Sequence, residues 1–223
     1  MVRRSMSSRA GSEYPTRTEG AAEFAQYGTD YLVDLPGYGP APNPRRDVML
    51  QNHANAFARC LEPEDIDCPS LVGPSMGSQV ITWPVLNSPE TTDRIALLAP
   101  TMDPVAPGFW HATGPSLRGI FTREPPAVNA IVSVDYFFRR GILYYLKQTV
   151  YLLADRIEDR LSLHALKGLL IRGDRDCICA DGSTRRVAGP LRDGGYAEVP
   201  GPHVFLFTDQ PRIAALVAHL ERA

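Results

Sequence analysis

The chain has 223 residues, 44% hydrophobic, 22% charged and 9% aromatic, and its 23 Lys and Arg against 25 Asp and Glu leave a net charge of −2. This balance excludes a disordered chain, collagen and a coiled coil, and it fits one globular domain whose core needs neither metal nor disulfide. Because no excess charge would attract nucleic acid or an anionic membrane, catalysis or small-molecule binding is the default expectation.

The sequence also bears on location and on its cysteines. No run of 18 apolar residues occurs, and the arginines near the N-terminus precede no hydrophobic stretch. We therefore expect neither a membrane span nor a secretory signal, and the cytoplasm is the simplest location. Cys60, Cys68, Cys177 and Cys179 lack the paired spacing of a zinc site, which predicts four reduced thiols and no metal.

Taken in chain order, residues 1–17 are rich in Ser, Arg and Gly without periodicity, which predicts a disordered or poorly anchored start. From residue 18 short apolar runs alternate with helical stretches. The expected strands are 31–34, 70–73, 94–99, 168–172 and 196–199, and the expected helices are 19–27, 48–61, 76–86 and 211–222. This alternation predicts an α/β fold with a mainly parallel, doubly wound sheet covered on both faces.

The segment 103–165 interrupts the alternation and divides the predicted core into residues 18–102 and 166–223. It is expected to be largely helical, and it holds nearly half of the chain's aromatic residues. Those side chains either pack the helices together or line an apolar pocket beneath a lid. We therefore expect a helical lid inserted between two strands of the sheet.

The strongest local motif is Gly73-Pro74-Ser75-Met76-Gly77, which lies between an apolar strand and a helical run. In a nucleophile elbow the serine occupies a strained turn between strand and helix, and the flanking glycines leave room for the neighbouring backbone. The five letters alone are weak evidence, because such a match arises by chance in roughly one chain in ten of this kind. The strand-turn-helix context makes Ser75 the candidate nucleophile.

A serine nucleophile needs a base to accept its proton, and the chain has five histidines. His53 and His219 lie in predicted helices, His111 lies in the lid and His164 precedes a strand. We expect these four to be solvated or packed. His203 differs because it follows a short strand at the edge of the sheet where the elbow is expected, which makes it the candidate base.

The base in turn needs a carboxylate to orient it, and the acidic turn after strand 168–172 offers Asp174 and Asp176. An isolated Asp-Arg-Asp would otherwise be interpreted as a solvated loop. With Ser75 and His203, however, it gives the order nucleophile, acid, base, each just past the C-terminal end of a predicted strand.

From about residue 31 onward the sequence resembles the α/β-hydrolase family. The resemblance rests on YLVDLPGYG, LVGPSMGSQV, LLAPTMDP, REPP, DYFFRRG, LLIRGDRD and VPGPHVFLFTDQP. It implies a Ser75–His203–Asp176 triad, favours Asp176 over Asp174, and implies that no metal or organic cofactor is needed. The implied activity is hydrolysis of an ester-like bond or a carbon–carbon bond next to a ketone in a small apolar substrate, through an acyl-enzyme.

The sequence departs from the family at its start. Family members carry about three strands and an HG-type turn ahead of the DLPGYG strand, and that turn supplies one of two oxyanion donors. Here the backbone N–H of Met76 is the one donor found, and the first strands are expected to be missing. Either the chain is truncated relative to a working enzyme, or a group within residues 1–20 takes the place of the second donor. An unpaired sheet edge would then be a candidate surface for a homodimer. The rival function is a catalytically weak or inactive fragment that binds a hydrophobic ligand or a protein partner.

Overall fold

The computed structural model describes residues 4–9, 23–38, 41–42, 44, 48–61, 68–100, 126, 141–163 and 166–222. The strands are β1 (Arg4–Arg9), β2 (Thr29–Asp34), β3 (Ser70–Pro74), β4 (Arg94–Leu98), β5 (Lys167–Gly173) and β6 (Arg192–Val199). The helices are α2 (Leu50–Leu61), α3 (Met76–Asn87), α6 (Ile142–Ala154), α7 (Ile157–Leu161), α8 (Asp181–Ala188) and α9 (Gln210–Arg222), with short 3-10 turns η2 (Pro89–Thr91) and η4 (Phe205–Phe207).

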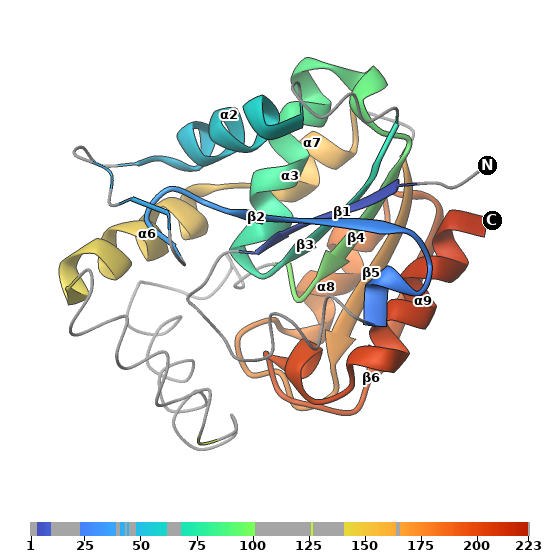
Figure 1. Cartoon of the computed structure of the whole chain (residues 1–223). Coiled ribbons are helices and arrows are strands. Elements are labelled where there is room, and N and C mark those ends of the chain that lie inside the picture. Colours follow the sequence, from blue (N-terminus) through green and yellow to red (C-terminus); the bar gives the residue numbers. More distant parts are fainter. Residues whose placement is uncertain are drawn as a thin grey trace.

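The strands form one parallel sheet in the order β2-β1-β3-β4-β5-β6. Consecutive residues of the central strands enter different cores, because side chains alternate across a sheet. Leu71 packs with α2 and α3 residues, whereas its neighbour Val72 packs with α9 residues. Figure 1 shows α2, α3 and α7 over one face and α9 over the other. The predicted mainly parallel sheet with helices on both faces is thus confirmed.

Residues 4–9 lie in the segment 1–17 for which we expect a disordered or poorly anchored start, and here the structure differs from that expectation. They form β1, which pairs with β2 on one side and β3 on the other. Met6 is the sole large apolar side chain in this strand, so the sequence RSMSSR has no apolar run to reveal it. A strand that precedes the DLPGYG strand is therefore present, contrary to expectation. The HG-type turn sought ahead of β2 would fall within residues 10–22, which lie outside the described residues.

The remaining predicted elements mostly agree with the structure. Strand β6 begins four residues earlier than expected, and α8 was not predicted. Residues 23–25 of the expected helix 19–27 are helical. Most of the expected lid, with many of its aromatic residues, lies outside the described part, but its C-terminal third forms α6 and α7. Among the described strands β2 is one edge of the sheet, and dimerisation through an open edge stays a prediction.

The C-terminal part of the expected lid, which holds α6 and α7, is bound to α3. The Arg160 guanidinium contacts the Asp155 carboxylate at 2.6 Å, and both side chains are under 10% exposed. Arg160 also donates to Thr82 Oγ1 at 3.1 Å and lies over the Trp83 ring. Gln79 donates to the carbonyl of Leu152.

No helix among the described residues is long and apolar enough to cross a membrane.

Candidate active site

The turn between β3 and α3 holds Ser75 in a strained backbone conformation. Its φ is 49° and its ψ is −122°, a backbone conformation that residues other than glycine seldom adopt. The Ser75 N–H donates to the carbonyl of Leu98 at 2.7 Å, which ties the turn to β4. A Cβ on Gly73 would lie 2.6 Å from backbone atoms of Gly77 and Ser78. The first glycine of the motif is therefore required by close backbone packing, as its spacing predicts.

His203 reaches Ser75 from the turn that follows β6. Its Nε2 lies 2.9 Å from Ser75 Oγ. The turn sits directly against the end of β5, where a Cβ on Gly173 would lie 2.5 Å from the carbonyl oxygen of Pro202. The two chain segments can approach this closely because Gly173 has no side chain. The imidazole is 11% exposed, so it is almost wholly enclosed.

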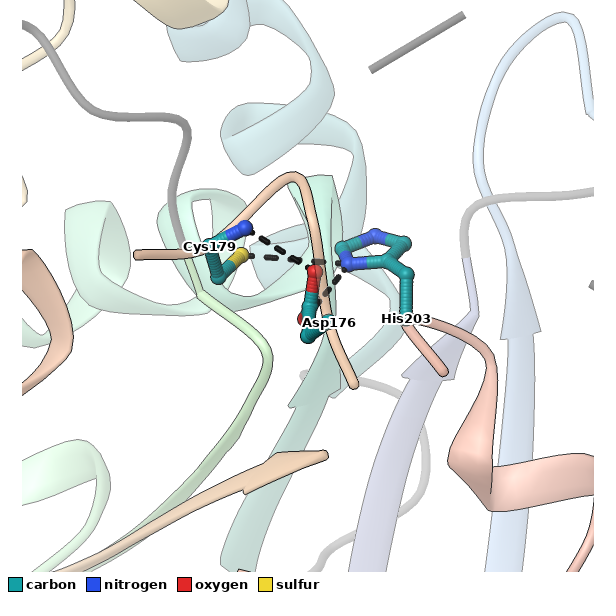
Figure 2. Close-up of side chains that lie close together, drawn as sticks. All are labelled: Asp176, Cys179 and His203. Atoms are coloured by element: carbon teal, nitrogen blue, oxygen red, sulfur yellow. Dashed lines mark hydrogen bonds and ion pairs between the residues drawn. The ribbon is translucent and has the colours of Figure 1, made fainter. Parts of the chain in front are cut away.

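Asp176 completes a continuous chain of contacts. Its Oδ2 lies 2.9 Å from His203 Nδ1 (Figure 2). Its Oδ1 accepts the backbone N–H groups of Ile178 at 2.8 Å and Cys179 at 2.9 Å. The carboxylate is completely buried. Because both oxygens have donors, the carboxylate is held in one orientation that fixes the Nδ1 side of the imidazole.

The two ionisable partners shift each other's pKa. Burial by itself would raise the pKa of the Asp176 carboxyl, but the charge and hydrogen bond of His203 and the two backbone N–H groups outweigh burial and lower it. Burial would likewise lower the pKa of His203, yet the charge of Asp176 raises it well above the ordinary value. The pair therefore stabilises an imidazolium beside a carboxylate, which is the ion pair formed when a histidine accepts a serine proton.

Asp174, the alternative acid, has a different place. It lies in the exposed turn after β5, and its Oδ1 accepts the backbone N–H of Gly201 at 2.8 Å. Its own N–H donates to the carbonyl of Val199. These bonds join the β5 turn to the turn that carries His203. Asp176 is thus the carboxylate in contact with the imidazole, and Asp174 shapes the backbone beside it.

Two residues at the site were not singled out by sequence reasoning. Arg172 is buried in β5, where its guanidinium donates to the carbonyls of Asp176 at 3.0 Å and Cys179 at 2.7 Å and pairs with Glu198 at 2.9 Å. Arg172 thereby holds the backbone of the loop 176–179 in place. For Cys179 the sequence predicts only a reduced thiol, whereas in the structure its Sγ lies 3.8 Å from His203 Nδ1. The sequence signal for Arg172 was an arginine inside an apolar strand, whereas no sequence signal pointed to Cys179.

The other candidates are distributed as follows. Met76 begins α3, where the first backbone N–H groups have no acceptor within the helix and can face an anion. His53 is buried in α2 with its ring 5.9 Å from that of Tyr38, and His219 is exposed on α9. His111 and His164 lie outside the described residues.

No protein-family model and no curated protein sequence matches the chain. Solved structures do match. An esterase from Exiguobacterium antarcticum is 12% identical, with a TM-score of 0.76 over 99% of this chain and 93% of its own. The chain has the α/β-hydrolase fold. An alpha/beta hydrolase enzyme from a Medee basin deep-sea metagenome library is 14% identical, with a TM-score of 0.74 over 99% of this chain and 90% of its own. The meta-cleavage product hydrolase from Pseudomonas fluorescens IP01 is also 14% identical, with a TM-score of 0.70 over 99% of this chain and 92% of its own. At these identities the likeness establishes the α/β-hydrolase fold.

Proposed function

We propose that this protein is a serine hydrolase that cleaves an ester-like bond, or a carbon–carbon bond next to a ketone, in a small apolar substrate. The observation that carries the proposal is the continuous chain from Ser75 Oγ through His203 to Asp176, with 2.9 Å at each step. Among the structural neighbours, one is named an esterase and another a meta-cleavage product hydrolase, so the fold supports either reaction.

In the proposed reaction His203 Nε2 accepts the proton of Ser75 as Oγ attacks the substrate carbonyl. The positive imidazole is stabilised by the Asp176 carboxylate on its other nitrogen. The tetrahedral oxyanion forms beside the N-terminus of α3, where the Met76 N–H donates to it. His203 then passes its proton to the leaving group. Water hydrolyses the acyl-enzyme by the same proton transfers in reverse.

Several features beyond the three side chains support this assignment. The elbow holds Ser75 in a conformation that costs on the order of 1–3 kcal/mol, and such strain concentrates at active sites. The raised pKa of His203 and the lowered pKa of Asp176 are the shifts expected for a base and its orienting acid. A protein that only bound an apolar ligand would need neither the strain nor the buried charged pair.

A fluorophosphonate probe tests the proposal, because it labels a serine only when its hydroxyl is activated. We expect the wild type to be labelled at Ser75, Ser75→Ala to remain unlabelled, and Ser162→Ala to be labelled like the wild type. Ser162 is an exposed serine at the C-terminal end of α7 and serves as the matched control. Turnover of short p-nitrophenyl esters should follow the same pattern.

Failure to label a wild-type protein that circular dichroism shows to be folded would refute the hydrolase and favour the rival, a protein that binds an apolar ligand or partner. Equal labelling of Ser75→Ala would place the nucleophile elsewhere. If Ser75 is labelled as expected, a comparison of ester substrates with ketone substrates would identify the reaction class, and a series of acyl chain lengths would show which chain length is preferred.

A further inference from the structure

Three different metal-binding side chains meet beside the proposed nucleophile. Asp176 Oδ2 lies 2.9 Å and Cys179 Sγ 3.8 Å from Nδ1 of His203, and the three ligand atoms all lie within 4.8 Å of one another (Figure 2). We propose that Asp176, Cys179 and His203 bind a borderline-soft divalent cation of the Zn²⁺ class, and that the bound cation switches off Ser75. The switch rests on the proposed hydrolase function; the binding site does not.

The distances suit such an ion. A zinc ion about 2.05 Å from Nδ1 and 2.3 Å from Sγ would see these atoms, now 3.8 Å apart, at an angle of roughly 120°. The carboxylate must move outward, because a tetrahedral angle needs about 3.4 Å between Nδ1 and Oδ2 where the structure has 2.9 Å. A displacement of about half an ångström therefore gives the nitrogen and the carboxylate oxygen their tetrahedral spacing, and Cys179 Sγ, within 4.8 Å of both atoms, supplies the third ligand.

The donor set selects the class of cation. One thiolate, one imidazole and one carboxylate suit Zn²⁺ or its softer analogue Cd²⁺, whereas Mg²⁺ and Ca²⁺ take oxygen ligands. The loop is also preformed. The N–H of Cys179 is bonded to Asp176, and Arg172 holds the carbonyls of both residues. The positive charge of Arg172 is itself paired with Glu198 at 2.9 Å, which reduces its repulsion of a second cation.

Protons explain why binding would stop catalysis. Without the cation, Nδ1 donates its proton to Asp176 and the bare Nε2 can accept the proton of Ser75. A cation on Nδ1 takes the electron pair at that nitrogen, so the ring proton moves to Nε2, and the Cys179 thiol releases its proton to solvent. An imidazole protonated at Nε2 cannot accept another proton from Ser75. Binding should therefore lower kcat and leave KM nearly unchanged, since substrate is not displaced.

The experiment uses a background in which the exposed thiols are removed by Cys60→Ser and Cys68→Ser. Cd²⁺ is titrated while the ultraviolet charge-transfer band of a cadmium thiolate is followed. Zn²⁺ inhibition of ester hydrolysis is measured in parallel and reversed with EDTA. Each variant is compared with its own metal-free rate. The variants are Cys179→Val, Cys179→Ser as a second choice of similar shape, and Cys177→Val as the matched thiol control.

We expect a 1:1 cadmium band and EDTA-reversible inhibition in the background and in Cys177→Val. Loss of an outer partner already costs 10–100-fold in metal affinity, so loss of the thiolate in Cys179→Val or Cys179→Ser should raise the inhibitory Zn²⁺ concentration by about 100-fold or more. Inhibition that persists in both Cys179 variants, or a folded background protein without a cadmium band, would overturn the site. A band without inhibition would overturn the switch. A Cys179-dependent band in a protein with no hydrolase activity would support the site while refuting the proposed function.

Discussion

Replacing Asp176 with asparagine alters one group beside His203 and leaves the rest of the loop's hydrogen bonds intact. The amide oxygen can occupy the place of Oδ1 and keep the N–H bonds from Ile178 and Cys179, now 2.8 and 2.9 Å long. The amide NH₂ then stands where Oδ2 lies, 2.9 Å from Nδ1, and it can only donate. His203 must therefore accept at Nδ1 and carry its proton on Nε2.

That tautomer cannot accept the proton of Ser75, so the whole contribution of the base is lost. The same substitution in a well-studied triad lowers kcat about 10⁴-fold, and we expect a loss of that order here. At about 1.4 kcal/mol per decade this raises the activation barrier by roughly 5 kcal/mol. Stability should change by only about 1 kcal/mol, because one hydrogen bond is weakened while a buried charge is removed.

Asp174→Asn is the matched control, because its amide oxygen keeps the bond to the N–H of Gly201. We expect this variant to retain activity within a few-fold. The assay is single-turnover labelling by a fluorophosphonate together with kcat on p-nitrophenyl butyrate, and thermal unfolding is measured on the same samples. Asp176→Asn that retains more than a tenth of wild-type turnover, or Asp174→Asn that loses as much, would refute the assignment of the acid.

Three further outcomes are expected. Gly173→Ala should lower both kcat and the free energy of unfolding, the latter by about 1–3 kcal/mol, because the new Cβ meets backbone of the turn that carries His203. Gly182→Ala on α8 should lower neither, because its Cβ would meet only the Arg186 side chain, at 4.0 Å. With EDTA present, the acid limb of the pH profile of kcat/KM should lie above pH 6.5, because the pKa of His203 is raised, and a limb at or below pH 6.5 would contradict that shift. For the same reason the stability that protonated His203 provides is full below pH 6.5 and is lost as pH rises through the raised pKa. Arg160→Met should lower the free energy of unfolding by about 3–5 kcal/mol in chemical denaturation, because it leaves the Asp155 carboxylate buried without its partner, and adding Asp155→Leu should recover much of that loss.

The sequence predicted the elements whose pattern is set by burial. Strands β3, β4 and β5 are short apolar runs because both of their faces are covered, and their ends therefore located Ser75 and Asp176. Strand β1 was missed because its place depends on backbone hydrogen bonds to two neighbours, which leave no mark on RSMSSR. Helix α8 was missed because polar residues and a glycine dominate it, and its stability comes from contacts with β5 and β6.

The candidate site divides in the same way. The three residues of the proposed triad follow strand ends and have distinctive chemistry, so position and residue type together indicated them. The choice between Asp174 and Asp176 rested on resemblance, since a register difference of two residues in a turn carries no periodic signal. The place of Cys179 next to the imidazole depends on how the loop after Asp176 folds back, with two N–H groups on one carboxylate oxygen. Such tertiary contacts have no counterpart in local sequence.

The backbone conformation of Ser75 also affects how this protein could be engineered. A glycine at position 75 would relieve a strain of about 1–3 kcal/mol, but it would also remove the hydroxyl that lies 2.9 Å from Nε2 of His203. A screen that ranks variants only by melting temperature would therefore retain Ser75→Gly wherever the relieved strain outweighs the lost contact, although this variant lacks the proposed nucleophile. Selection for stability and selection for turnover therefore favour different residues at position 75, so Ser75 should be kept unchanged when this protein is engineered for stability.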